Sequence, residues 1–431
     1  MFVKLNNNSN SVPIPETENK MISKTKIRDL FRLCYISSCN YSKDAKESRL
    51  KNVLLLYKLS RLEIEQCRHP ELTAAELENH LRKRGIDYDS ILKHHEINKS
   101  FQEKVQSCFN SFGLETRTVN RFNYSQSDIK WCDVVFPIGG DGTFLFAASR
   151  ILDNEKPVIG FNADPCRSEG HLCLPKRYSN NVHLALDKIL QGKFKWLFRT
   201  RIRVTFSGDT SRQSPVELHE PAQRFKLSDM TEEGRKDRRV DFIKPGEEYR
   251  PPFLALNEVF LGEVLTAKVS YFEMRINNSS KSAEVKSSGL CVCTGTGSTS
   301  WSMSINRLNR QDIREIIELY LKESAGAKGC RNVDKGLIDS IYENYNERFK
   351  YQPEKLKMAY TIRDLISVGV WPYPKGVIEP RGFADRIEVR SKCSDAGLVL
   401  DGGISFPFNE GTVTHLETHS QDSLRTVLLC E

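Results

Sequence analysis

Short apolar runs alternate with helical patterns over the first half of the chain. Strands are expected at residues 53–56, 116–119, 133–138 and 158–160, where apolar side chains form short continuous runs. Apolar residues recur at helical spacing between them, and Thr73 with Glu76 has the spacing of a capping box at one helix start. Strands that alternate with helices predict a parallel sheet with helices packed on it.

The second half of the chain has the period-two pattern of half-buried strands. One run is expected from Trp196 to Phe206, where apolar residues alternate with arginines. Further runs lie at residues 253–261, 269–276, 290–294, 386–390, 398–400, 412–416 and 426–429. Sandwich-like packing is the expected way to bury so many alternating strands, so this part is predicted to be mainly β.

Two segments interrupt the β pattern. Residues 207–250 are charged, poor in apolar side chains and broken by three prolines, which predicts a long and at least partly disordered loop. Residues 310–350 have helical spacing, and such helices could cover the site, support an oligomer or pack locally. The predicted organisation is a leading segment at 1–48, an α/β domain at 49–190 and a β-rich domain at 191–431. The last strands of the β-rich domain could pack back on the α/β domain.

Composition narrows the classes of protein. The 431 residues hold no apolar window long enough to span a bilayer, which argues against a membrane protein. A net charge of +8 without a dense basic block argues against nucleic acid as a partner. The 12 cysteines have irregular spacings without a zinc pattern, so we expect reduced thiols in an intracellular compartment.

The N-terminal region has features of a targeting signal. From Met21 to about residue 45 the chain is rich in lysine, arginine and serine, and Ile27, Leu30, Phe31 and Cys34 fall at helical spacing. A basic amphipathic helix of this kind predicts a mitochondrial presequence and a location in the matrix. The alternative is an ordinary surface helix, in which case we expect a cytoplasmic protein.

The motif with the clearest chemistry is Gly139-Gly140-Asp141-Gly142-Thr143, placed after one expected strand and before a helix. Glycines allow a sharp turn and close approach of a ligand, and free amides at a helix start attract phosphate oxygens. An aspartate at such a turn suggests a further task, which could be holding magnesium, accepting a proton from an attacking hydroxyl, or both. The structural alternative is a tight turn with Asp141 as the helix N-cap.

Other glycine-rich segments argue against two common nucleotide-binding folds. Gly295-Thr296-Gly297-Ser298-Thr299-Ser300 lacks the third glycine of a dinucleotide fingerprint. No segment has the glycine-lysine-serine/threonine ending of a phosphate loop. The Rossmann and Walker types are therefore disfavoured.

Several motifs in a consistent order resemble the NAD kinase family, in the form written by its mitochondrial type. The GGDGT turn is shared with diacylglycerol and sphingosine kinases and indicates phosphoryl transfer. Residues 160–172 are similar to the second family motif, and Asn257-Glu258 matches the asparagine-glutamate pair. Residues 293–301 match the threonine-rich strand and turn, and Asp401-Gly402-Gly403 resembles the late aspartate-glycine motif. The resemblance runs from about residue 50 to the C-terminus.

The resemblance implies a fold and a reaction. The NAD kinase fold pairs an α/β domain carrying GGDGT with a β-rich domain, and the reaction transfers the γ-phosphate of ATP to the 2'-hydroxyl of the adenosine ribose of NAD, giving NADP. Asp141 would be the catalytic residue. Phosphates of ATP would contact Gly139, Gly140, Gly142 and Thr143. The NAD-binding residues would be Asn162, His171, Asn257, Glu258, Thr296, Ser298, Thr299 and Trp301. Magnesium is expected to arrive with ATP, with Asp141 as its only candidate protein ligand, and a homodimer is the expected assembly.

One departure from the family pattern keeps other functions open. Ser288-Gly289 stands where many family members have the aspartate-glycine that contacts the nicotinamide end. A lipid or sphingoid-base kinase would share GGDGT but needs an apolar substrate channel. A catalytically weak protein that senses NAD or ATP is the non-enzyme alternative.

Overall fold

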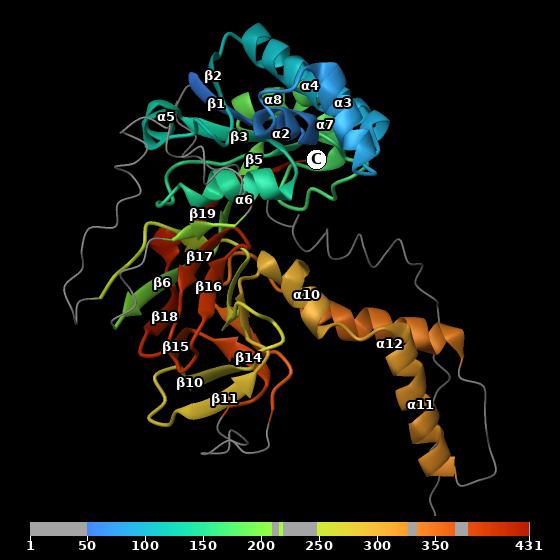
Figure 1. Ribbon diagram of the computed structural model, residues 1–431, viewed down its shortest axis with the longest axis vertical. Helices are drawn as coiled ribbons and strands as arrows, with labels where there is room; N and C mark the ends of the chain where they lie inside the picture. The colour runs from blue at the N-terminus through green and yellow to red at the C-terminus, as the bar shows by residue number, and fades with distance from the viewer. Residues whose placement is uncertain (1–49, 209–214, 219–247, 326–333, 367–377, 431) are drawn as a thin grey trace, which may run out of the picture. The chain divides into compact units, whose positions relative to one another are not determined.

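The computed structural model describes residues 50–208, 215–218, 248–325, 334–366 and 378–430 (Figure 1). Residues 47–431 form one compact unit. The expected presequence and most of the expected disordered loop at 207–250 lie outside the described residues. None of the described helices is long and apolar enough to cross a membrane.

The first part of this unit is a parallel sheet with helices on both faces, as predicted. Its strands lie in the order β2-β1-β3-β4, and every neighbouring pair is parallel. The strands are β1 (Asn52–Tyr57), β2 (Glu115–Val119), β3 (Val134–Gly139) and β4 (Phe161–Asn162). The helices are α2 (Arg61–Arg68), α3 (Ala74–Lys83), α4 (Tyr88–Ser111), α5 (Gln126–Trp131), α6 (Asp141–Ser149), α7 (Lys176–Asn180) and α8 (Val182–Leu190).

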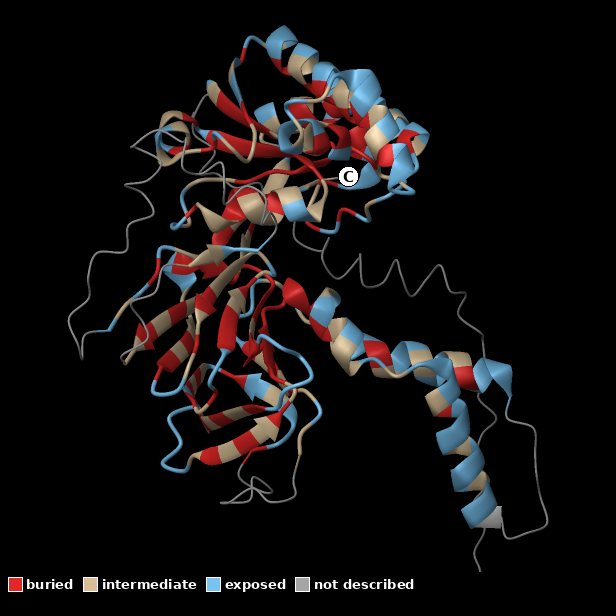
Figure 2. Cartoon of the chain, in the orientation of Figure 1, coloured by how far each residue is buried: buried red, intermediate tan, exposed pale blue. Residues whose placement is uncertain are grey.

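Alternate residues of the central strand β1 supply the cores of the two faces. Val53 and Leu55 pack with α4 and α8 on one face. Leu54 and Leu56 pack with α5 and α6 on the other. Because β1 is buried on both sides, its sequence is continuously apolar, as expected for a parallel strand covered by helices (Figure 2).

The second part is a sandwich of two sheets, which confirms the predicted β-rich fold. One sheet has the order β11-β10-β15-β18-β6-β8 and the other β14-β13-β12-β9-β16-β17-β7. Apolar residues of both sheets meet in one core, including Val204 and Leu416 from the first and Leu261 and Leu398 from the second. The strands are β6 (Ile202–Ser207), β7 (Val216–Glu217), β8 (Leu254–Ala255), β9 (Glu258–Glu263), β10 (Ser270–Ile276), β11 (Ala283–Ser287), β12 (Leu290–Cys293), β13 (Met358–Ile362), β14 (Arg381–Ala384), β15 (Arg386–Ser391), β16 (Ala396–Leu400), β17 (Ile404–Pro407) and β18 (Val413–Thr418).

Helices interrupt the sandwich after β12. They are the short helix η3 (Gly297–Thr299), α10 (Trp301–Asn306), α11 (Arg310–Ala325) and α12 (Lys335–Glu347). The last two correspond to the helical segment expected at 310–350. A further short helix, η5 (Ser420–Asp422), precedes the last strand.

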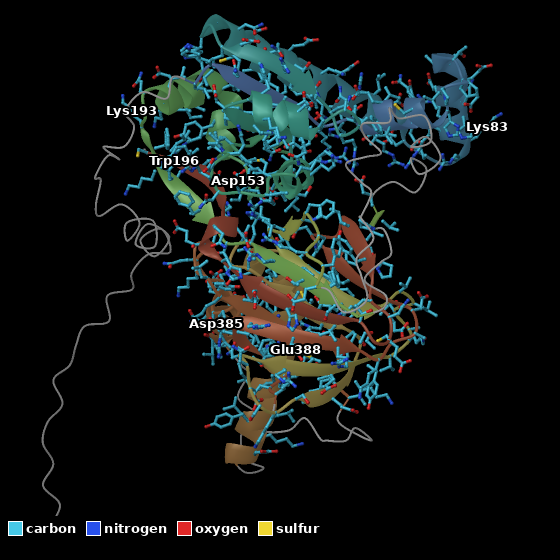
Figure 3. All side chains as sticks on the ribbon, turned by 90° about the vertical axis from the view of Figure 1, so that its left-hand side faces the viewer. Lys83, Asp153, Lys193, Trp196, Asp385 and Glu388 are labelled. Carbon is cyan, nitrogen blue, oxygen red and sulfur yellow. The ribbon has the colours of Figure 1, made fainter. Side chains whose placement is uncertain are left out.

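A two-stranded antiparallel sheet joins the two parts. It consists of β5 (Phe194–Arg199) and β19 (Leu424–Leu429), which lie far apart in the sequence. Val427 of β19 belongs to the same buried cluster as Val53, and Trp196 of β5, labelled in Figure 3, packs against it. The end of the chain therefore packs on the α/β core.

The buried Arg201 strengthens this junction. It lies between β5 and β6 and is 0% exposed. Its guanidinium donates to the carbonyls of Ala148 and Ile151 at the end of α6, of Asp153 and of Asp422 (3.2 Å for Ala148, 3.0 Å for Asp153). Arg201 thus links the helix that begins at the glycine turn to the start of the sandwich.

Three predicted strands are wrong in their limits. The single run expected from Trp196 to Phe206 is two strands, β5 and β6, because Arg201 turns inward and the two halves join different sheets. The run expected at 253–261 is likewise split into β8 and β9. Residues 158–160 hold only an isolated bridge from Val158 to Val135, and the strand begins one residue later, at Phe161.

Candidate functional site

The glycine turn connects β3 directly to α6. Gly139 ends the strand and Gly140 is the N-cap of the helix. A Cβ atom on residue 139 would lie 2.3 Å from Oγ1 of Thr143, so only glycine fits there without displacing that side chain. The first amides of a helix have no intrahelical acceptor, and they form an anion-binding site at its positive end.

Asp141 is held in a defined position at this turn. One carboxylate oxygen accepts the Leu172 amide at 2.8 Å and the other accepts the His171 amide at 3.1 Å. The alternative role of Asp141 as N-cap is wrong, because Gly140 occupies that position and Asp141 is the first helical residue. Since each carboxylate oxygen has more than one lone pair, Asp141 can still accept a proton or a further hydrogen bond.

Residues of the second motif mainly shape the loop that fixes Asp141. The Asn162 side chain donates to the carbonyl of Ser168 at 2.9 Å and accepts the amide of Asp164 at 3.2 Å. Asn162 also lies beside Gly139 in the sheet register. His171 is exposed, and its backbone amide is the group that contacts Asp141.

Asn257 and Glu258 present unsatisfied acceptors inside the sandwich. Asn257 is 6% exposed and Glu258 is 9% exposed. Oδ1 of Asn257 and Oε2 of Glu258 have no hydrogen-bond donor among the described residues. Buried polar atoms without a partner are rare, so each of these oxygens is a candidate to receive a donor from a ligand. Both are enclosed, and a ligand that reaches them must displace the groups that cover them.

The environment of Glu258 favours its neutral form. Burial, and secondarily the charge of Asp401, raise the pKa of Glu258 from 4.5 to about 8. Cys293 pairs with Glu258 across the sheet, and Cys291 lies further along the same strand. The charge of Glu258 contributes to raising the pKa of both thiols, after burial.

Asp401 determines the shape of the backbone at this pair. Its carboxylate accepts three successive amides, from Leu256 at 2.8 Å, Asn257 at 2.7 Å and Glu258 at 3.0 Å. The Asp401 amide returns a bond to the Glu258 carbonyl at 2.9 Å. Burial raises the pKa of Asp401 to about 6, although the three hydrogen bonds from backbone amides and the charge of Arg201 act to lower it. Asp401 is absent from the predicted site residues, although its motif was visible in the sequence.

The threonine-rich turn holds the same two residues from the opposite side. The Thr294 hydroxyl donates to the Leu256 carbonyl at 2.5 Å. Gly297 lies against Asn257, and a Cβ on residue 297 would be 2.0 Å from the Asn257 carbonyl oxygen. The glycine is required because the backbones of the two motifs are in direct contact.

The hydroxyl groups of this turn make mostly local hydrogen bonds. Ser298 donates to the Gly295 carbonyl at 2.7 Å, and Thr299 donates to the Thr296 carbonyl at 3.3 Å. Oγ1 of Thr296 accepts from Nη1 of Arg199 at 3.4 Å. Arg199 and Asp141 both influence the Cys173 thiol, whose pKa is raised chiefly by burial. Arg199, a residue that no motif indicated, therefore connects the threonine-rich turn to the neighbourhood of Asp141.

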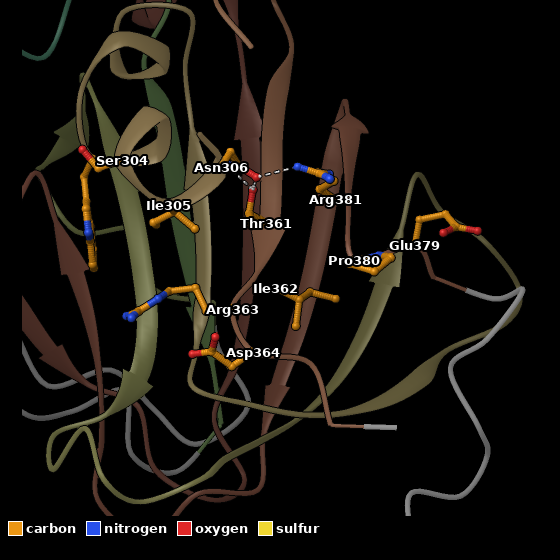
Figure 4. A pocket seen from close by; sticks show the side chains of 11 residues that line it. Ser304, Ile305, Asn306, Thr361, Ile362, Arg363, Asp364, Glu379, Pro380 and Arg381 are labelled. Carbon is orange, nitrogen blue, oxygen red and sulfur yellow. Dashed lines mark hydrogen bonds between the residues drawn. The ribbon is translucent and has the colours of Figure 1, made fainter. Parts of the chain in front are cut away.

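Trp301 lies apart from this group and lines a separate cavity. It is 39% exposed and packs on Phe260, with ring centroids 4.9 Å apart. The cavity has a volume of about 740 Å³, and its charged lining combines two arginines, Arg363 and Arg381, with two acidic residues, Asp364 and Glu379 (Figure 4). Neither Asp141 nor the Asn257-Glu258 pair lines it. The cavity is therefore distinct from the glycine turn.

The structure brings the two halves of the predicted site together through apolar packing. Leu256, which precedes Asn257, is buried in the same cluster as Leu172 and as Phe144 of α6. Leu172 is also the residue whose amide contacts Asp141. Within the described residues, no hydrogen bond joins Asp141 directly to Asn257 or Glu258.

The fold and these groups define a small-molecule kinase of the GGDGT class. Comparison with known proteins identifies its family. The chain is 38% identical to "NAD kinase 2, mitochondrial" of Rattus norvegicus over 88% of each chain. It is 38% identical to the Homo sapiens protein of that name, over 88% of this chain and 85% of the other. The sequence model of the ATP-NAD kinase N-terminal domain matches residues 73–194. The chain belongs to the NAD kinase family.

A solved structure is also similar. It is an NAD kinase from Archaeoglobus fulgidus in complex with ATP, with 15% sequence identity and a TM-score of 0.46. The similarity covers 88% of this chain and 93% of that one.

The raised pKa of Glu258 makes a testable prediction about proton release. Hydroxyl donors from NAD would favour the ionised carboxylate, so binding near pH 7 should release up to about one proton. Calorimetric titration of NAD in buffers of different ionisation enthalpy measures this release. We expect no release from Glu258→Gln.

The same substitution should change the pH dependence of stability. The folded chain holds this proton up to about pH 8 and the unfolded chain only up to about 4.5. The free energy of unfolding of the wild type therefore falls as the pH rises through that window, because the folded state binds more protons. Glu258→Gln should lose this contribution. In the calorimetric titration of NAD, equal proton release by the wild type and by Glu258→Gln would contradict the assignment of the released proton to Glu258.

Proposed function

We propose that Asp141 is the catalytic residue of this chain, acting on the 2'-hydroxyl of the adenosine ribose of NAD. As a member of the NAD kinase family the chain is an ATP-dependent NAD kinase, which converts NAD to NADP. The observation that carries the assignment is the pair of hydrogen bonds from backbone amides that fixes the Asp141 carboxylate at the start of α6. No other carboxylate is placed at the glycine turn among the site residues described above.

The chemistry requires alignment more than a strong base. The ribose oxygen forms a bond to the γ-phosphorus, the bond from that phosphorus to the β,γ-bridging oxygen breaks, and ADP leaves. Because the transition state is loose, the hydroxyl proton can be released late. A carboxylate is a weak base toward a sugar hydroxyl, so Asp141 would orient the hydroxyl first and accept its proton as the new bond forms.

We further propose how the two substrates divide the site. The amides at Gly140 and Gly142, with Gly139 and Thr143, would receive phosphates of ATP at the positive end of α6. NAD would contact Asn162, His171, Thr296, Ser298, Thr299 and Trp301. The adenosine part of NAD would supply donors to Asn257 and Glu258, whose buried oxygens lack them. The backbone bonds already made by His171 and Ser298 support a role for these residues in shaping the site.

Magnesium is proposed to enter bound to ATP. The described residues contain no group of three or more histidine, cysteine, aspartate or glutamate side chains that could hold an ion. Magnesium sites in phosphoryl-transfer enzymes commonly combine one or two carboxylates with substrate phosphates, and Asp141 fits that pattern. The ion would neutralise phosphate charge, while Asp141 keeps the hydroxyl aligned.

Replacement of Asp141 tests the catalytic assignment. Asp141→Asn should lower NADP formation at least about 100-fold, because the group that orients and accepts the proton is lost. The assay follows NADP with a coupled NADP-specific dehydrogenase in the presence of ATP and Mg²⁺. Asp187→Asn on α8 removes a similar charge away from the turn and should retain activity. Near-normal turnover of a folded Asp141→Asn protein would contradict the proposal.

We propose a mitochondrial location, in the matrix. The relatives are named as mitochondrial, and residues 21–45 combine basic and apolar residues at helical spacing. A fluorescent protein fused after residue 48 should enter mitochondria, and replacing Arg28 and Arg32 by glutamate should abolish import. Uniform cytoplasmic fluorescence of the unmodified fusion would contradict this location.

We propose that the chain forms a homodimer. Large apolar side chains are exposed on the helical insertion, with Ile316 56%, Leu319 60% and Leu337 46% exposed. An exposed apolar patch of this kind commonly marks an interaction surface. Light scattering of the purified chain should give twice the mass of 49.4 kDa, and Ile316→Glu with Leu319→Glu should reduce it toward the monomer. A monomeric wild type at micromolar concentration would refute the dimer.

A further inference from the structure

Lys58 occupies the position in the sheet where a ligand of a parallel α/β fold is expected. It follows β1 directly, and its amide donates to the Ile138 carbonyl at 3.0 Å. The register that pairs Tyr57 with Ile138 therefore continues to place Lys58 opposite Gly139. In the order β2-β1-β3-β4 the strand that follows β1 in the sequence lies on one side of it and β3 lies on the other, so the switch point lies between β1 and β3. Ligands bind outside the carboxyl ends of the strands at such a switch point. Lys58, which follows β1, and the glycine turn, which follows β3, lie on the two sides of that point.

The Lys58 side chain leaves β1 on the face that carries α6. Alternate residues of a strand share a face, and Leu54 and Leu56 pack in the cluster that contains Phe144 of α6. A Cβ atom added to Gly139 would lie 2.9 Å from Cβ of Lys58 and 2.3 Å from Oγ1 of Thr143. The side chain of Lys58 therefore starts beside the first turn of α6. It places a cation on the face on which the preceding residues Leu54 and Leu56 are apolar.

The charge of Lys58 has no partner among the described residues. The residue is exposed, and within the described ranges its ammonium group makes no hydrogen bond and no ion pair. The Asp141 carboxylate at the same turn is held by the amides of His171 and Leu172. An unpaired ammonium beside a helix N-terminus adds positive charge to a position that already attracts anions.

We propose that Lys58 binds the phosphate chain of ATP, together with the amides at the start of α6. This inference rests on the proposed function, because it adds a residue to the same phosphate site. Lysine binds phosphate as a mobile point charge on a long stem, so it can follow the γ-phosphate as negative charge redistributes during transfer. Lys58 would then contribute both to ATP binding and to the transfer step.

The competing interpretation is an ordinary solvated lysine. Most exposed lysines contribute little to function, and exposure alone would not distinguish Lys58 from Lys51 at the opposite end of β1. Lys51 lies at the amino edge of the sheet, away from the glycine turn. It therefore provides a matched control, with the same charge at the other end of the same strand.

The experiment compares Lys58→Gln, Lys58→Arg and Lys51→Gln in the full chain. Steady-state rates are measured with ATP varied at saturating NAD and with NAD varied at saturating ATP. Lys58→Gln should lower kcat/KM for ATP by about 10- to 100-fold, the usual effect of losing a hydrogen bond to a charged group. The KM for NAD should change by less than about threefold, since that substrate keeps its own contacts. Lys58→Arg should recover part of the loss.

A binding measurement separates the phosphate contact from a general structural effect. The wild type should bind ATP more tightly than adenosine, and Lys58→Gln should reduce this difference without altering adenosine binding. Unfolding temperatures of the three variants should match the wild type, because both lysines are exposed.

Each outcome has a distinct meaning. If the wild type makes no NADP, the proposed function fails, whatever Lys58 does. If the wild type is active and Lys58→Gln has an unchanged kcat/KM for ATP, the Lys58 proposal is overturned while the function stands. An increase confined to the KM for NAD would also overturn it, because the lysine would then bind the diphosphate of NAD. Equal losses of kcat/KM for ATP in Lys58→Gln and Lys51→Gln would also overturn it, because the effect would then come from net charge and not from the position of Lys58.

Discussion

The hydrogen bonds of the Asp401 carboxylate are the interactions on which the Asn257-Glu258 part of the site depends. It collects the amides of Leu256, Asn257 and Glu258, three successive groups that leave β8 and enter β9. A peptide segment between two sheets would otherwise leave these donors unpaired, at a cost of about 1–3 kcal/mol for each buried group. Because the carboxylate supplies the acceptors, the chain can change sheets at this point and present both side chains of the pair.

A second constraint joins this segment to the glycine turn at the start of α6. Arg201 donates to carbonyls at the end of α6, and Leu256 packs with Leu172 and Phe144 near its beginning. Helix α6 is therefore held at both ends by contacts with the start of the sandwich. Asp141 is in turn fixed by the amide of Leu172. The position of the Asp141 carboxylate thus depends on packing between segments more than 80 residues apart, as in Leu172 and Leu256.

The chemistry of the site is shaped by buried acceptors that lack a donor among the described residues. Oxygens of Asn257 and Glu258 are buried without donors, and the raised pKa of Glu258 reflects the cost of keeping its charge there. Such a site is poorly stabilised when empty and gains hydrogen bonds on binding. It also rejects analogues that lack the matching donors, since a buried acceptor left unpaired costs binding free energy. The absence of an acid at Ser288 does not affect these groups, which lie in the adenosine half of the proposed site.

Local patterns in the sequence were sufficient for the parallel sheet, the sandwich and the glycine turn, because burial on one or two faces imposes a period on apolar residues. The capping box at Thr73 and Glu76 could also be predicted, because all its hydrogen bonds are local. The breaks at Arg201 and at Leu256-Asn257 were not predicted, because the alternation of apolar residues continues through both. Only the tertiary structure decided them, through a buried guanidinium and a distant carboxylate. Asp401 and Lys58 acquire their roles in the same way: one lies 144 residues from Asn257 and the other opposite Gly139, and no local pattern records contacts over such separations.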